Sequence, residues 1–399
     1  MDAAAASLPI TVPTLSTART IRVIGLSLAL GYLVFLGATY LQGDFLSDRQ
    51  GRPIANDFVN VVAAGRLALG GEPSAAYDFS AQKAAEVRAL GHDFDGYYPW
   101  PYPPPFLLVA GALASLPYLA AALASLLGTL AAYVAAMWGI LGRTGIFVAL
   151  GFPAALWNVT AGQNGFLTAA LIGGTLGLLQ RRPVLAGVCL GLLTYKPQFG
   201  LLFPLALIAD RRWLTMAIAA TVALALAALS WLAFGSASWQ AFVHWMPVTS
   251  RIVFGEGQAD WSRLQSLFGL VRAQGGSEQL AWTIQTTGSL IVAASVTWLW
   301  RSRLPYDLKA AALAGGTLLA TPYLYMYDLT ALAVAAAFLI RHTLERGFHA
   351  SECAGLLGAG ALILIFPYAN TQTGLAAVVL VSALIAQRAY CVATKSAPH

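Results

Sequence analysis

Residues 213–234 read WLTMAIAATVALALAALSWLAF, a run without a single charged side chain. A membrane-spanning helix needs about 20 apolar residues. The strands of a membrane β-barrel instead alternate polar and apolar residues over about ten positions. Because this run does not alternate, it predicts a transmembrane helix.

The composition of the whole chain has the same character. Of its 399 residues, 58% are hydrophobic and 10% are charged, and the mean hydropathy is +0.68. Soluble domains carry roughly 25% charged residues. The expected fold class is therefore an all-α, polytopic membrane protein. No tandem repeat or linker divides the chain, so residues 1–399 are expected to form a single membrane-embedded domain.

Arginine pairs predict how the chain is oriented, because cytoplasmic loops are enriched in Lys and Arg. The pairs expected inside are Arg181/Arg182, Arg211/Arg212, Arg301/Arg303 and Arg341/Arg346. This orientation predicts about 12 transmembrane helices and two large extracytoplasmic loops, residues 43–103 and 235–279. Residues 106–116 are expected to be re-entrant or interfacial, because a full crossing there would break the charge rule downstream.

Lys196 lies near the middle of residues 183–210, between the first two arginine pairs. Each half of this stretch would be about 20 Å long as a helix, too short to cross ~30 Å of hydrocarbon. We therefore expect two short or tilted helices that meet at Lys196. An intramembrane lysine is a candidate site residue and could hold a lipid phosphate. The alternative is a side chain that extends to the membrane interface.

Acidic residues are concentrated in the first outer loop, which holds eight of the seventeen: Asp44, Asp48, Asp57, Glu72, Asp78, Glu86, Asp93 and Asp95. Asp57 directly precedes residues 59–69, whose apolar positions predict an interfacial amphipathic helix. Asp57 is interpreted either as the N-cap of that helix or as a catalytic carboxylate, and the two roles are compatible.

Further candidates lie at other predicted outer ends. Gln163 and Asn164 form a polar turn that could bind sugar hydroxyls, or could be a plain hairpin turn. Tyr102 belongs to the proline-rich segment 97–106, which is either a rigid interface anchor or a stacking platform. Tyr327 and Asp328 mark another helix boundary. We expect these segments to converge on one pocket that opens away from the cytosol.

The second outer loop contributes Gln265, while its other polar residues, Arg263 among them, are interpreted as ordinary solvated groups. Asp93-Phe94-Asp95 matches a short metal-binding pattern too weakly to predict a metal site. The chain has no nucleotide-binding loop, dinucleotide fingerprint, zinc-ligand cluster or nucleophile elbow. Its net charge of +6 follows membrane orientation and does not indicate nucleic-acid binding.

Six short motifs occur in the same order as in a known family of enzymes. They are Asp57-Phe58, Tyr102-Pro103-Pro104-Pro105-Phe106, Gly162-Gln163-Asn164, Lys196-Pro197-Gln198, Gln265-Ser266-Leu267 and Tyr327-Asp328. With them the chain resembles the multi-spanning GT-C glycosyltransferases, and most of all glycosyltransferase family 87. Its characterised members are polyprenyl-phosphate-mannose-dependent α-mannosyltransferases. The family often has a histidine where this chain has Tyr323, so any role of that histidine does not carry over.

The resemblance implies a catalytic aspartate at Asp57 and a polyprenyl-phosphate sugar donor, with no metal or other cofactor. The expected function is transfer of a hexose, with mannose as the expected sugar, to a glycolipid or glycan acceptor. The expected location is the plasma (inner) membrane, with the site facing the periplasm or exterior. A transporter or flippase of lipid-linked sugars is the alternative, since such proteins also contain broken helices. A third possibility is a lipid A or protein glycosyltransferase of the same architecture.

Overall fold

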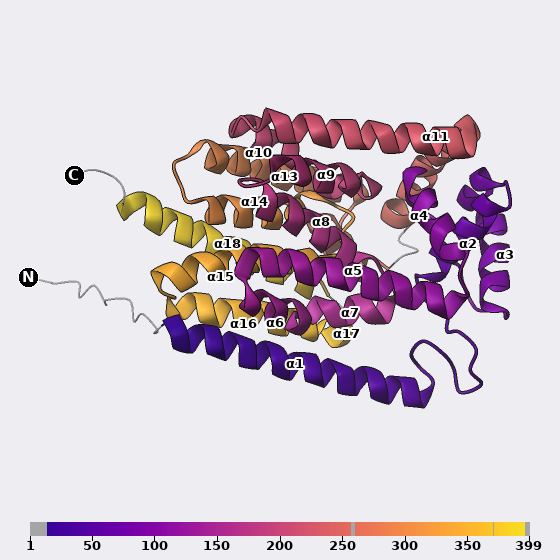
Figure 1. The fold of residues 1–399 in the computed structure, drawn as a ribbon, viewed down its shortest axis with the longest axis horizontal. Helices are drawn as coiled ribbons and strands as arrows, with labels where there is room; N and C mark the ends of the chain where they lie inside the picture. Colours follow the sequence, from indigo (N-terminus) through magenta and orange to yellow (C-terminus); the bar gives the residue numbers. More distant parts are fainter. Residues whose placement is uncertain (1–13, 257–259, 370, 396–399) are drawn as a thin grey trace, which may run out of the picture.

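The computed structural model describes residues 14–256, 260–369 and 371–395, and within them the chain forms helices and no strand. Figure 1 shows these helices side by side in one body. The longest are α1 (Thr14–Gln42), α5 (Tyr118–Leu141), α11 (Trp213–Ser250), α13 (Glu278–Arg301) and α18 (Thr373–Lys395).

Shorter helices make up the rest of the body. Those of intermediate length are α8 (Gly165–Leu178), α14 (Tyr306–Ala320), α15 (Leu332–Arg346) and α16 (Ala350–Leu364). The shortest α-helices are α2 (Val59–Leu69), α3 (Phe79–Leu90), α4 (Pro105–Ala114), α6 (Arg143–Gly151), α7 (Pro153–Ala161), α9 (Pro183–Leu192), α10 (Phe203–Ala209), α12 (Leu267–Ala273) and α17 (Phe366–Ala369). The 3₁₀ turns are η1 (Pro73–Tyr77), η2 (Leu193–Tyr195), η3 (Pro197–Phe199), η5 (Trp261–Arg263) and η6 (Met326–Ala331), and η4 (Arg251–Gly255) is a π turn.

The core surrounds α15. Residues 332–339 are almost completely buried, and α15 packs against α14, α5 and α8. Long helices cover this core on opposite sides, with α1 along one side and α11 along the other (Figure 1). Both carry exposed leucines and valines, such as Val34 (73% exposed) and Leu232 (72% exposed). Large apolar side chains on the outside are the surface that lipid requires, so the chain is a helical membrane protein.

Five helices are long and apolar enough to cross a membrane, namely Ser16–Gln42, Tyr118–Leu141, Trp213–Gly255, Met326–Arg346 and Thr373–Thr394. A sixth crossing results if α6 and α7, which meet at a bend of 56°, count as one span. The expected count of 12 is thus not confirmed. The reason is length: many apolar runs form helices of 10–17 residues, and ten residues of helix extend only about 15 Å.

The break at Lys196 has the predicted form. Helices α9 and α10 are short, and η2 and η3 separate them on either side of Lys196. Most of residues 106–116 belong to another short helix, α4 (Pro105–Ala114). In the first outer loop, the helix predicted over residues 59–69 is present with those bounds as α2.

The second outer loop differs from the prediction. A loop was expected from Gly235 onward, but α11 continues to Ser250. Gly235 has φ 73° and ψ 173°, a conformation that glycine tolerates and other residues avoid. The backbone is therefore interrupted at this one residue, and the helix resumes beyond it.

Gly65 sets the contact between α2 and α4, because a Cβ there would overlap the Ala110 carbonyl oxygen and lie 2.6 Å from Ala114 Cβ. We predict that Gly65→Ala destabilises the protein by about 1–3 kcal/mol through overpacking. This loss exceeds the ~1 kcal/mol gain in helix propensity. Thermal unfolding in detergent measures the effect.

Gly111 on the facing helix provides the matched control. A Cβ there would meet only the Leu69 side chain, at 3.8 Å or more. Gly111→Ala should therefore leave the unfolding temperature unchanged or raise it. If the two alanine variants were equally stable, Gly65 would not limit the approach of α2 to α4.

Candidate active site

A cavity of about 1120 Å³ lies where the first outer loop meets the ends of several helices. Its lining residues fall within 55–60, 97–103, 157–163, 195–198, 242–254, 260–263, 321–327 and 366–367. These segments are far apart in sequence, and they include most of the predicted outer ends. The expected convergence on one pocket is therefore present in the structure.

Asp57 lines this cavity and is fixed by the turn between α7 and α8. Its backbone N–H donates to the Ala161 carbonyl oxygen (3.1 Å). Its Oδ2 accepts a hydrogen bond from Gln163 Nε2 (2.7 Å). Among the described residues, Oδ1 has no hydrogen-bond partner. One carboxylate oxygen is thus held in place and the other is available to a ligand.

The predicted role of Asp57 as a helix N-cap is wrong. The N-cap position of α2 is Phe58, and no side chain caps that helix. Asn56 Oδ1 accepts from the Phe58 N–H (3.0 Å) and makes the local turn instead. The reason is tertiary: the Asp57 carboxylate is directed to Gln163, more than 100 residues away in sequence.

Glycines allow the turn between α7 and α8 to approach its neighbours closely. Gly162 has φ 67°, and a Cβ there would lie 2.7 Å from Asn56 Oδ1. A Cβ on Gly165 would overlap the carbonyl oxygen of Tyr327. These two positions accept only glycine, because both sides of the turn are in contact with segments that line the cavity.

Tyr102, Gln163 and Asn164 form one hydrogen-bonded group behind Asp57. Asn164 Nδ2 donates to the Tyr102 hydroxyl (2.8 Å), which donates to Gln163 Oε1 (3.3 Å). The Asn164 carbonyl oxygen accepts from the Tyr195 hydroxyl (3.2 Å). Tyr102 and Gln163 line the cavity, whereas Asn164 does not. The orientation of the amide that holds Asp57 is therefore itself fixed.

The proline-rich segment 97–103 forms a wall of the cavity and is anchored by buried groups. The Tyr98 N–H donates to both carboxylate oxygens of Glu86, at 3.1 and 3.2 Å. Burial raises the pKa of Glu86 to about 7. The Tyr77 hydroxyl donates to the Tyr102 carbonyl oxygen (2.9 Å). The sequence did not identify Glu86 or Tyr77 as residues that support the site, because both bonds go to a segment more than ten residues away.

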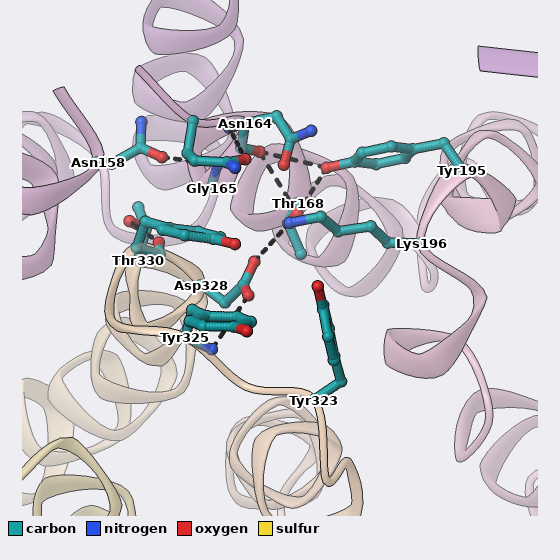
Figure 2. A network of polar contacts seen from close by, with 12 residues as sticks. Asn158, Asn164, Gly165, Thr168, Tyr195, Lys196, Tyr323, Tyr325, Asp328 and Thr330 are labelled. Atoms are coloured by element: carbon teal, nitrogen blue, oxygen red, sulfur yellow. Dashed lines mark hydrogen bonds and ion pairs between the residues drawn. The ribbon is translucent and has the colours of Figure 1, made fainter. Parts of the chain in front are cut away.

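Lys196 and Asp328 form a buried ion pair. Lys196 Nζ lies 2.7 Å from Asp328 Oδ1, and only 6% of Lys196 and 1% of Asp328 are exposed. Figure 2 shows the pair joining the segment after η2 to η6, with Tyr323 and Tyr325 beside it. Asp328 Oδ2 also accepts from the Tyr325 N–H (3.3 Å). Lys196 lines the cavity and Asp328 lies behind it.

Tyrosines complete the wall next to this pair. The Tyr327 ring is stacked on Tyr325, with centroids 5.5 Å apart, and Lys196 Nζ lies 5.1 Å from its centroid. Tyr323 lines the cavity too, and burial raises its pKa to about 12. At neutral pH Tyr323 is therefore a neutral hydrogen-bonding group, where the family often has a histidine that can be charged.

The electrostatic environment of Asp57 reflects its position below the protein surface. Burial raises the pKa of Asp57 above the usual range of an aspartate. The hydrogen bond from Gln163 opposes this rise, and so do the positive charges of Lys196 and Arg263. A carboxylate with a raised pKa and one unpartnered oxygen is suited to accept a proton.

Gln265 does not line the cavity. It is completely buried, and its Nε2 donates to the Ser262 carbonyl oxygen (2.9 Å). Its Oε1 accepts from the Gly374 N–H (2.8 Å). Its own N–H donates to the Leu324 carbonyl oxygen (2.7 Å). Gln265 therefore connects η5 to α18 and to the segment containing Tyr323.

Arg263 is a cavity residue that sequence reasoning did not select. It belongs to η5, and its side chain is exposed to the cavity that it lines. The available signal was its position two residues before the Gln265-Ser266-Leu267 motif.

Asp93, by contrast, lies 3.3 Å from Lys83 Nζ and outside the cavity lining. In the part of the chain that the structure describes, no three His, Cys, Asp or Glu residues are grouped as a metal site would require.

Residues 100–322 match the sequence model of glycosyltransferase family 87, which is more than half of the chain. The chain belongs to glycosyltransferase family 87. No curated protein and no solved structure matches it. This membership makes the protein a membrane glycosyltransferase and confirms the resemblance seen in the motifs.

The match to family 87 covers only part of the cavity. Tyr102, Gln163 and Lys196 lie inside the matched range, while Asp57 and Tyr327 lie outside it. The tertiary structure brings these outlying residues to the same cavity as the matched ones. The candidate active site of this family 87 protein therefore includes Asp57 on structural grounds.

We predict that Lys196→Met and Asp328→Asn each destabilise this family 87 protein by about 3–5 kcal/mol, because each leaves one buried polar group without its partner. The double variant Lys196→Met/Asp328→Asn should lose less than the sum of the two, since no buried charge remains. Thermal unfolding of the purified variants in detergent measures this coupling. Strictly additive losses would contradict the stabilising role of the pair.

Proposed function

We propose that the protein transfers a hexose, with mannose as the expected sugar, from a polyprenyl-phosphate donor to a glycolipid or glycan acceptor. The site would lie at the extracytoplasmic face of the plasma membrane. The observation that carries the proposal is Asp57, held by Gln163 through one oxygen and open to the cavity through the other. This is the arrangement that a general base on an acceptor hydroxyl requires.

The proposed reaction is a direct displacement at the anomeric carbon of the donor. The acceptor oxygen forms a bond to this carbon while Asp57 takes the hydroxyl proton. The bond between the anomeric carbon and the phosphate oxygen breaks, and polyprenyl phosphate leaves with the electron pair. A single displacement inverts the configuration, so a β-linked donor gives an α-linked product. The step as proposed uses no nucleotide.

The cavity wall supports a lipid-linked donor. Phe242, Trp245 and Met246 line it from the extension of α11 beyond Gly235. Met246 is 49% exposed, and the same helix carries exposed apolar residues such as Val243 (56%). An isoprenoid chain could therefore pass between the cavity and the membrane along α11. The headgroup would then lie among Lys196, Tyr102 and Tyr327.

A transporter or flippase of lipid-linked sugars remains the alternative function. The broken helices at Lys196 favour it, because such breaks line the binding sites of transporters. The two functions differ in one measurable property: detergent abolishes vectorial transport but not sugar transfer. Formation of a glycosylated product from a purified polyprenyl-phosphate sugar and a water-soluble acceptor in detergent would identify a transferase.

We predict that Asp57→Asn lowers the transfer rate by roughly 10²–10⁴-fold, because the amide cannot accept the proton. Asp78→Asn in the same outer loop is the matched control. Asp78 caps α3 by accepting from the Ala81 N–H (2.9 Å), and asparagine preserves this role. If the folded Asp57→Asn protein kept its rate, Asp57 would not be the base.

A second prediction concerns pH. Because a general base acts as the carboxylate, activity should fall as the pH drops through the pKa of Asp57. The acidic limb of kcat/KM should therefore lie above the ~3.9 of an ordinary aspartate. Gln163→Leu removes a hydrogen bond that stabilises the charged form, so it should move the limb to higher pH. Measured pH profiles of both proteins test this, and an unmoved limb would argue against the role of Gln163.

A further inference from the structure

Among the described residues that line the cavity, two side chains are cationic, and they differ in their partners. Lys196 is neutralised by Asp328 at 2.7 Å, and the pair is almost fully buried. Arg263 lines the same cavity and is exposed to it. Arg263 makes no side-chain hydrogen bond or ion pair with any described residue. It is therefore the cation whose charge is available to a ligand.

The charges around the cavity support this distinction. Asp57 and Asp260 are the acidic residues in the described lining. Asp260 uses Oδ1 to accept from the Ser262 N–H (3.0 Å), which starts the η5 turn. A sugar phosphodiester adds one negative charge, and the monoester that leaves carries between one and two. Lys196 is already paired with Asp328, so the added charge needs another cation. Arg263, whose positive charge also acts on Asp57, is the other cation in the described lining.

The turn that carries Arg263 is fixed from behind by Gln265. Gln265 Nε2 donates to the Ser262 carbonyl oxygen, and its Oε1 accepts from the Gly374 N–H at the start of α18. Its backbone N–H donates to the Leu324 carbonyl oxygen, next to Tyr323. Gln265 thus connects η5 to α18 through its side chain and to the segment containing Tyr323 through its backbone.

We infer that Arg263 binds the phosphate of the donor and that Gln265 positions the turn that presents it. The inference rests on the proposed function. A guanidinium group matches phosphate geometry with two parallel N–H donors. As the bond between the anomeric carbon and the phosphate oxygen breaks, the electron pair moves onto that oxygen and Arg263 stabilises the charge. Gln265 acts through Arg263 and is a positioning residue.

Binding of the leaving group tests the inference without any sugar transfer. The probes are a long-chain polyprenyl monophosphate and the matching polyprenyl alcohol, each titrated into the purified full-length protein in detergent. The wild type should bind the phosphate more tightly than the alcohol. Arg263→Ala should lose roughly 10- to 100-fold in affinity for the phosphate and nothing for the alcohol. Arg263→Lys should retain part of the difference.

Three further variants make the test specific. Arg251→Ala removes another exposed arginine of the same region, one that lies outside the cavity lining, and should bind as the wild type does. Gln265→Leu should reduce the preference for phosphate over alcohol, which a general loss of stability would not change. Asp57→Asn should bind the phosphate at least as tightly as the wild type, because it removes a negative charge from the cavity and leaves Arg263 in place.

The outcomes separate this inference from the proposed function. Suppose that Arg263→Ala keeps the wild-type preference for phosphate over alcohol and that Lys196→Met loses it. The phosphate would then be assigned to Lys196. This result would overturn the inference and leave the proposed function intact. A wild type that binds phosphate and alcohol equally would instead contradict the polyprenyl-phosphate donor, and the inference with it.

Discussion

The ion pair between Lys196 and Asp328 is the interaction on which the architecture of the site depends. It joins residues 132 positions apart in the chain, in surroundings where an unpaired charge would cost several kcal/mol. The backbone that carries Lys196 is irregular, and irregular backbone at membrane depth needs protein or water around it. Pairing with η6 provides that protein environment. It also fixes Tyr325 and Tyr327 as a stacked wall.

A second connection brings the first outer loop to this wall. Asp57 is tied to the turn between α7 and α8 by its own N–H and by Gln163, and the same turn contacts Tyr327 through Gly165. The proposed base and the buried pair are thus positioned by two sides of one short turn. The geometry of the site therefore depends on Gly162 and Gly165, which allow this turn to approach the segments that carry Asn56 and Tyr327.

Charge divides the cavity into parts with different roles. The Lys196–Asp328 pair is balanced and buried, so it serves mainly to hold segments together. Asp57, which has one carboxylate oxygen bound to Gln163 and the other without a described partner, faces the cavity as a candidate proton acceptor. Arg263 faces it as a candidate anion ligand. Phe242, Trp245 and Met246 of α11 give the cavity an apolar wall. Together these parts match what a lipid-linked, charged donor and a hydroxyl acceptor would each need.

The sequence by itself determined the class of the fold, because uncharged runs of membrane length can only be helices in lipid. It also determined the break at Lys196, the helix at residues 59–69 and the family, since these depend on local spacing and short motifs. It did not determine the number of crossings or the continuation of α11 beyond Gly235, because hydropathy does not reveal where a helix bends or stops short. Only the tertiary structure decided the partner of Lys196 and the direction of the Asp57 carboxylate. It likewise decided the burial of Gln265 and the position of Arg263 in the cavity lining. Each depends on which distant segments come into contact, and that is set by packing of the whole helical body.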